Sequence, residues 1–256
     1  MNRYRAVLAY DGTAYHGFQR QVGQTPTIQG RVESALQQVT GQSVTVIGAG
    51  RTDAGVHASG QVIAFDVNWR HEASDLLRAL NANLPDDIAL QEIAVAAAGF
   101  HPRFSARSRT YVYRFYQRRV RNPLWDRYAW QIGTPLDIAA MRRAAALLIG
   151  ERDFATFGQP PQGENTVRRV MRSALARDGD LHNYTITANA FLQRMVRSIV
   201  GTLVEVGRGA MQLDDFEAAV SAADRSLAGP TAPPHGLTLV AVVYDDENAG
   251  RDAPRQ

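Results

Sequence analysis

Strand-like alternation of apolar and polar residues and helix-like apolar stripes follow one another along this chain in an order that restricts it to a mixed α+β fold. A strand pattern begins at Tyr4 and ends at the turn signal Asp11-Gly12. A helix follows, with an N-cap at Thr27, a stop at Thr40-Gly41 and one apolar stripe: Ile28, Val32, Ala35, Leu36 and Val39. Strands over 44–47 and 61–67, a helix near 74–80 and a strand over 88–95 come next. Strands and helices do not alternate one for one, so we predict a mixed or antiparallel sheet with helices on one face.

A similar order of elements recurs after residue 107, which predicts two similar halves. Its patterns predict a strand over 111–116, a helix over 137–149 and a hairpin of 167–176 with 181–188 around Asp178-Gly179. Helices over 191–206 and 214–223 and a strand over 237–244 follow. We therefore expect an N-terminal α+β half over 1–107, a C-terminal α+β half over 108–247 and a flexible tail over 248–256.

Composition excludes several classes of protein. The 256 residues contain no cysteine, which excludes a disulfide scaffold, a cysteine nucleophile, a thiolate zinc site and an iron–sulfur cluster. The six histidines show no metal-ligand spacing, so we expect no metal. No secretory signal and no apolar run of about 20 residues stand out, so we expect a cytoplasmic protein without a membrane partner. All 28 basic residues are arginine and the net charge is +3, which fits a polyanionic partner.

The loop from Gly48 to Ala58 is the densest local arrangement of chemically useful residues. It joins two predicted strands and carries Arg51 and Asp53, a cation and a carboxylate two residues apart. If both point into one cleft, the guanidinium keeps Asp53 ionised and available as a nucleophile. The alternative is a strand-connecting turn with a surface ion pair, which has little functional meaning.

The segment from His101 to Asn122 combines positive charge with aromatic rings and contains no acid. Its aromatic residues Phe104, Tyr111, Tyr113, Phe115 and Tyr116 offer flat faces for unstacked bases, beside cations for phosphates. The alternative is a basic edge strand with core aromatics. We expect phosphate contacts from Arg103, Arg107 and Arg109. The seven arginines are Arg103, Arg107, Arg109, Arg114, Arg118, Arg119 and Arg121.

Arg194 and Arg197 form a third candidate. They are three residues apart on the helix predicted over 191–206, so they share one helical face and either could reach inward. The alternative is that both extend to water at the edge of an apolar stripe.

The stretch Ala49-Gly50-Arg51-Thr52-Asp53-Ala54-Gly55-Val56-His57 resembles the catalytic-aspartate loop of the tRNA pseudouridine synthase A family. Further blocks resemble that family in its order, and the likeness covers about residues 4–244. The blocks are Tyr10-Asp11-Gly12-Thr13, Gly17-Phe18-Gln19-Arg20-Gln21, Asn81-Ala82-Asn83-Leu84-Pro85, Phe104-Ser105-Ala106-Arg107, Gly150-Glu151-Arg152-Asp153-Phe154, Asn189-Ala190-Phe191 and Met195-Val196-Arg197-Ser198-Ile199-Val200-Gly201.

The resemblance implies an isomerase that converts uridine to pseudouridine at positions 38, 39 and 40 of the tRNA anticodon arm, without a cofactor or an obligatory metal. Asp53 matches the family's nucleophilic aspartate and Tyr111 the tyrosine that stacks on the target uracil. Arg51 matches the basic residue that holds the flipped nucleotide, and Arg197 the arginine that pairs with the aspartate. It also implies a homodimer whose chains have two RNA-recognition-like halves with the active-site cleft between them.

Two other functions remain open from the residues alone. A non-catalytic tRNA-binding module would use the same arginines and aromatics without any reaction. A carboxylate hydrolase would need a second acid beside Asp53, and Asp66 is the acid nearest in the local sequence. For the isomerase, the residues leave open whether Asp53 attacks C1′, adds to C6 or assists a glycal route. Tyr111 is one of several candidates for the base that removes the C5 proton.

Overall fold

The chain divides into two compact units. The structure, a computed structural model, describes residues 1–23, 25–160 and 163–245. Unit 1 contains residues 1–108 and 239–245, and unit 2 contains residues 109–238. The tail predicted over 248–256 lies outside the described residues. Among those described, no helix is both long and apolar enough to cross a membrane.

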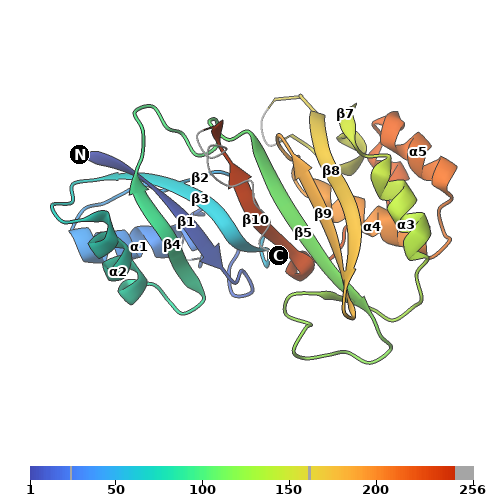
Figure 1. Ribbon diagram of the computed structural model, residues 1–256, viewed down its shortest axis with the longest axis horizontal. Helices are drawn as coiled ribbons and strands as arrows, with labels where there is room; N and C mark the ends of the chain where they lie inside the picture. Colours follow the sequence, from blue (N-terminus) through green and yellow to red (C-terminus); the bar gives the residue numbers. More distant parts are fainter. Residues whose placement is uncertain (24, 161–162, 246–256) are drawn as a thin grey trace, which may run out of the picture. The chain divides into compact units, whose positions relative to one another are not determined.

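In unit 1, two helices lie side by side against paired strands (Figure 1). The strands lie in the order β4 (Ile88–Val95), β1 (Asn2–Tyr10), β3 (His57–Val67) and β10 (Leu237–Val243), and the short β2 (Ile47–Gly48) pairs with β3. The β1–β4, β1–β3 and β2–β3 pairs are antiparallel. The helices are α1 (Ile28–Thr40) and α2 (Ala73–Asn83).

Periodicity explains how these elements form. Alternate residues of β1 are buried, as expected of a strand with one covered face. The helix predicted between Thr27 and Gly41 is confirmed: the Thr27 hydroxyl accepts a hydrogen bond from the backbone N–H of Gly30. Ile28, Val32 and Leu36 are buried, so the predicted stripe is the face that forms the core of unit 1.

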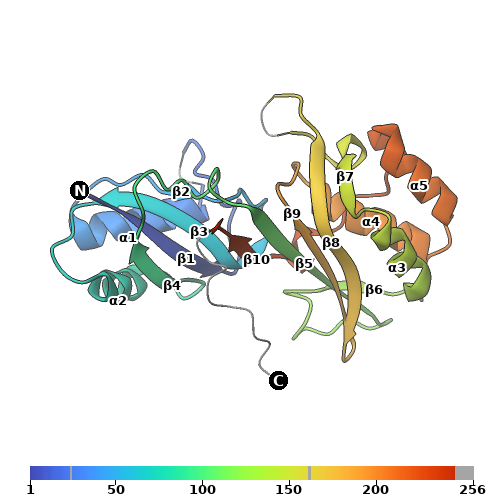
Figure 2. The same cartoon turned by 45° about the horizontal axis from the view of Figure 1, so that its top comes forward.

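Unit 2 combines strands with three α-helices, which can be followed in Figure 2. Its strands lie in the order β5 (Ser108–Gln117), β9 (Leu181–Ala188), β8 (Val167–Asp178) and β7 (Gly150–Asp153), and β6 (Trp130–Ile132) runs parallel to β5. The helices α3 (Ile138–Ala146), α4 (Met195–Gly207) and α5 (Leu213–Ala222) contact one another. With five α-helices and mixed strand pairing in the described residues, the predicted α+β class is confirmed.

The last strand differs in its placement from the expectation. We expected residues 239–245 to belong with the C-terminal half, whereas they cluster with unit 1, in which β10 is hydrogen-bonded to β3. Unit 1 is therefore built from two separate pieces of the chain.

The strand predicted over 44–47 is wrong over most of its length. Val44 and Val46 are buried, but strand pairing is limited to Ile47 and Gly48. Two polar side chains of α1 take up the backbone groups of Val46 instead. The side-chain amide of Gln29 donates to the carbonyl oxygen of Val46 at 3.1 Å, and the backbone N–H of Val46 donates to the carboxylate of Glu33 at 3.0 Å. The apolar alternation thus reflects burial without a strand.

Candidate functional site

The loop between β2 and β3 presents Arg51 and Asp53 on either side of a buried threonine. Thr52 is only 7% exposed, whereas Arg51 is exposed and Asp53 is half-buried. The backbone of the loop is fixed at its start and in its middle: the N–H of Ala49 donates to the carbonyl oxygen of Val62, and the N–H of Phe18 donates to the carbonyl oxygen of Thr52 at 3.1 Å. The backbone on either side of Asp53 is therefore held in place, and the residue itself is partly exposed.

The side chain of Thr52 fastens the loop to the end of β1. Its hydroxyl is hydrogen-bonded to the buried hydroxyl of Tyr10 at 2.8 Å. Burial raises the pKa of Tyr10 to about 12, so this phenol is neutral at physiological pH. The sequence placed Tyr10 only within a block resembling a family and gave no sign that it supports the aspartate loop.

We expect Thr52→Val to lower the free energy of unfolding by about 1 kcal/mol, because valine keeps the shape of threonine but removes the partner of a buried hydroxyl. Urea denaturation measures this loss. Thr52→Ser keeps the hydroxyl and is the matched control. Equal stability of the valine and serine variants would show that the hydrogen bond contributes nothing.

A close backbone approach fixes the far end of the same loop. A Cβ atom on Gly12 would lie 2.0 Å from the carbonyl oxygen of Val56, so only glycine fits there. The backbone N–H of Gly12 donates to Nδ1 of His57, which lies 3.1 Å from the carboxylate of Asp11. The block around Asp11 and Gly12 therefore serves to hold the loop that carries Asp53.

In unit 2, Tyr111 lies on β5 with its ring almost entirely buried. It is 8% exposed, and its ring packs edge-on against Phe191 with centroids 4.9 Å apart. On β9 its partner is Ile186. The plane of the ring is thus fixed by packing before any ligand binds.

Arg197 lies in the first turn of α4, where a returning segment of backbone binds it. Its Nε donates to the carbonyl oxygen of Ala232 at 2.8 Å, and its own carbonyl oxygen accepts the N–H of Ala232 at 3.0 Å. Gly201, one turn further along, permits this approach, since a Cβ atom there would lie 1.6 Å from the carbonyl oxygen of Pro230. The guanidinium of Arg197 is therefore held in one orientation.

The prediction that Arg194 and Arg197 share one helical face is wrong. Arg194 adopts a left-handed conformation with φ of 63°, and α4 begins after it at Met195. An apolar stripe does not reveal a helix start, because the residues before the first turn can be buried in an extended or turned backbone.

The three arginines predicted to contact phosphates lie in different settings. Arg107 is exposed and forms a bidentate ion pair with Asp245. Arg109 is only 8% exposed, and its Nη1 donates to the carbonyl oxygen of Asn189 at 2.8 Å. Arg103 is half-buried beside Phe104. The structure thus commits Arg109 to a contact inside unit 2.

The predicted row of aromatic faces is wrong for three of its members. Tyr113, Phe115 and Tyr116 have no exposed ring surface and belong to the core of unit 2. Tyr113 donates its hydroxyl to the carbonyl oxygen of Pro233, and Tyr116 bonds Asp126. For these residues the alternative of core aromatics is the correct interpretation.

Asp66 does not lie beside Asp53. Asp66 is opposite Arg3 at one end of the β1–β3 pair, whereas the loop that carries Asp53 enters β3 at the other end, where Ala58 is opposite Tyr10. Asp66 forms a double hydrogen bond with Arg3, at 2.9 and 2.7 Å, which lowers the pKa of its carboxyl group. The paired-carboxylate hydrolase therefore has no second acid in Asp66.

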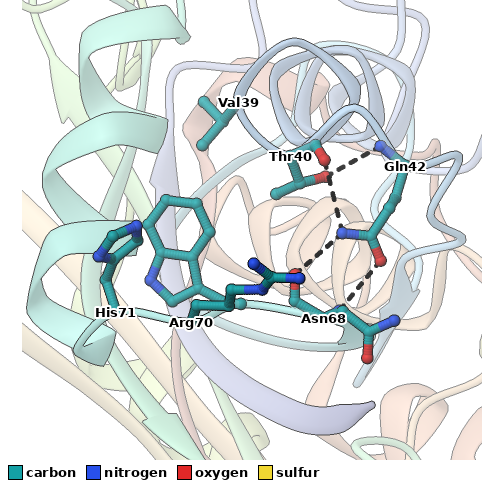
Figure 3. Close-up of a pocket in the computed structure, with 7 residues that line it drawn as sticks. Val39, Thr40, Gln42, Asn68, Arg70 and His71 are labelled. Carbon is teal, nitrogen blue, oxygen red and sulfur yellow. Dashed lines mark hydrogen bonds between the residues drawn. The ribbon is translucent and has the colours of Figure 1, made fainter.

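One surface hollow of about 370 Å³ lies at the C-terminal end of α1 (Figure 3). The side chain of Gln42 closes one side of it by two hydrogen bonds to the backbone of Asn68. Within the described ranges, no group of three or more His, Asp or Glu side chains could hold a metal ion. None of the predicted site residues lines the hollow, whose lining is Val39, Thr40, Gln42, Asn68, Trp69, Arg70 and His71.

Comparison with known proteins gives consistent results. The sequence profile of a family described as tRNA pseudouridine synthase matches residues 6–105 and 144–245, which include Asp53 and Arg197; Tyr111 lies between the two matched segments. The chain is 42% identical over 258 residues to tRNA pseudouridine synthase A of Agrobacterium fabrum, covering 99% of this chain and 97% of that protein. It is 44% identical over 245 residues to the protein of that name from Brevibacillus brevis, covering 95% and 100%.

Proposed function

Because the chain belongs to the tRNA pseudouridine synthase family, we propose that it isomerises uridine to pseudouridine at positions 38, 39 and 40 of the tRNA anticodon arm. Isomerisation of uridine is the general reaction of this family of enzymes. It breaks the bond from ribose C1′ to uracil N1, turns the base and joins C1′ to C5, after which C5 loses its proton and N1 carries a proton in the product. No atom is added to or removed from the nucleotide overall, so the reaction has no need of a redox partner.

In this proposal Asp53 is the nucleophile. The observation that carries the assignment is the pairing of an accessible carboxylate with a buried neighbour, Thr52, which is bonded to Tyr10. A nucleophile needs a defined position and access to the substrate, and the held backbone and partial exposure of Asp53 support this assignment. Arg51, exposed two residues before Asp53, would hold the displaced nucleotide through its phosphate.

The target base must leave the helical stack before it can react, and the proposal assigns Tyr111 and Arg197 to receive it. Removing a base from the stack costs a few kcal/mol, and stacking on an aromatic ring returns about 1–3 kcal/mol. Tyr111 suits this role because Phe191 fixes the plane of its ring. Arg197, oriented through Ala232, would supply the counter-charge that keeps Asp53 ionised. The active site would then lie in a cleft between the two halves of the chain, which are similar RNA-recognition-like units.

We also propose that the enzyme is a homodimer and that Arg103 and Arg107 contact tRNA phosphates. We expect replacement of both by glutamine to weaken tRNA binding and to reduce its salt dependence, by up to about 0.9 in logarithmic slope for each phosphate that is no longer neutralised. Binding titrations at several salt concentrations measure this slope. An unchanged slope would contradict the proposed phosphate contacts.

Release of tritium from uridine labelled at C5 tests the proposed reaction. The purified protein is incubated with transcribed tRNA, without added metal, and the released label is counted. We expect release that falls when uridines 38, 39 and 40 are replaced by cytidine. Binding of tRNA without release would instead support a tRNA-binding module, and release that persists without these three uridines would contradict the assigned positions.

A further inference from the structure

A tight turn in unit 1 holds a phenylalanine ring in solvent. Phe104 is 78% exposed, whereas the nearby ring of Phe100 packs against Tyr244 with centroids 5.1 Å apart. An exposed aromatic ring offers a flat face on which an unpaired base can stack.

Hydrogen bonds within the turn fix the direction of this ring. Nδ1 of His101 accepts the backbone N–H groups of Arg103 and Phe104, at 3.2 and 3.3 Å. The N–H of Ser105 donates to the carbonyl oxygen of His101 at 2.9 Å, and the N–H of His101 donates to the hydroxyl of Ser105 at 3.1 Å. The imidazole of His101 also stacks on Phe104 with ring centroids 4.3 Å apart.

The turn is anchored to the body of unit 1 on both sides. The hydroxyl of Tyr244 donates to the carbonyl oxygen of Pro102 at 2.7 Å, and Nη1 of Arg3 donates to that of Phe100 at 3.0 Å. After the turn, the N–H of Arg107 donates to Val243 at 2.8 Å. Phe104 therefore stands on a rigid support.

This support lies at the opposite end of the sheet from the aspartate loop. Arg3, which binds Phe100, faces Asp66 on β3, and the aspartate loop enters β3 near Ala58. These two positions on β3 are eight residues apart, or about 26 Å at the rise of a β-strand. Because Phe104 follows Phe100 by four residues, we expect a contact made by its ring to fall on a nucleotide other than the target base.

We propose that Phe104 is a second RNA contact, on which an unpaired base of the tRNA stacks outside the reaction site. His101 stacks on one face of the ring, so a base would use the remaining face. The guanidinium of Arg103, which lies over the ring with its central carbon 5.8 Å from the centroid, would then turn to the adjoining phosphate. An aromatic face next to a cation suits a nucleotide better than a neutral apolar protein surface. The inference rests on the proposed function, because it takes tRNA to be the substrate.

Binding of tRNA to variants at residue 104 tests the inference. We expect Phe104→Ala and Phe104→Leu each to weaken binding about 10-fold, because neither side chain has an aromatic face, and Phe104→Trp to keep parental affinity. In the tryptophan variant, tRNA should quench the added indole emission, measured against the parent with its three native tryptophans. Val95→Ala, which trims an exposed apolar residue on β4, is the control and should bind as the parent does.

Two results would overturn the inference. The first is binding by Phe104→Ala within 2-fold of the parent together with unquenched emission from Phe104→Trp. The second is a change of oligomeric state in Phe104→Ala with binding restored by Phe104→Leu, which would identify a contact between copies of the chain. Tritium release by the parent is measured in parallel, so a failure of the proposed function is seen separately.

Discussion

Replacing Asp53 by asparagine should reduce the release of tritium from labelled tRNA by more than about 10³-fold, the scale seen when a covalent nucleophile is removed. Asparagine has the size and shape of aspartate, so the loop held by Thr52 and Gly12 should keep its conformation. Affinity for tRNA should stay close to that of the parent, because the amide leaves the arginines and aromatic rings unchanged. Single-turnover release and a binding titration with the same tRNA separate the two quantities.

Asp75→Asn provides the matched control for this substitution. Asp75 is a carboxylate on α2 that forms an exposed ion pair with Arg78, and such pairs contribute at most about 1 kcal/mol. This variant should therefore fold and react as the parent does. If Asp53→Asn released tritium at a rate close to that of Asp75→Asn, Asp53 would not be the nucleophile.

Gly201→Ala should destabilise the protein by about 3 kcal/mol or more, a large effect for one methyl group. The new Cβ atom would lie 1.6 Å from the carbonyl oxygen of Pro230, so either α4 or the segment before Ala232 must move. That segment binds Arg197 through two hydrogen bonds, so turnover should fall along with stability. Thermal denaturation and tritium release at a temperature where the variant is folded measure both effects.

Gly30→Ala is the corresponding control. Gly30 also lies in a helix, but the nearest atom to its added Cβ is the rotatable hydroxyl of Thr27 at 3.1 Å. We expect a change in stability within about 1 kcal/mol, because a better helix former offsets a small adjustment of the N-cap. Equal behaviour of the two variants would show that the approach of Pro230 to α4 is not a constraint.

The sequence predicted those elements whose apolar pattern reflects a single covered face. The helix from Ile28 to Thr40 was predicted to its ends because its cap, stripe and terminal glycine agree. The segment around Val46 was mispredicted because side chains of α1, which are distant in sequence, bind its backbone. Apolar spacing reports burial, but it does not report which partner satisfies the backbone.

In the candidate site too, some features could be predicted from the sequence and others could not. The loop containing Asp53 could be chosen from its composition and its likeness to a family, whereas the supports at Tyr10 and Ala232 are contacts between segments far apart in sequence. The charge run after His101 was evident, but charge alone could not show that Arg109 is committed to Asn189 while Phe104 remains exposed.

The placement of β10 has a consequence for the order in which the chain can fold during synthesis. A ribosome completes β1, β3 and β4 well before it makes residues 237–243, the strand that lies next to β3. Unit 2 is continuous in sequence, so all of its own strands have been synthesised before β10 is complete. The nascent enzyme therefore carries an unfinished sheet edge until its last strand leaves the exit tunnel, and a stop codon shortly before Leu237 would leave that edge permanently open to pairing with other chains.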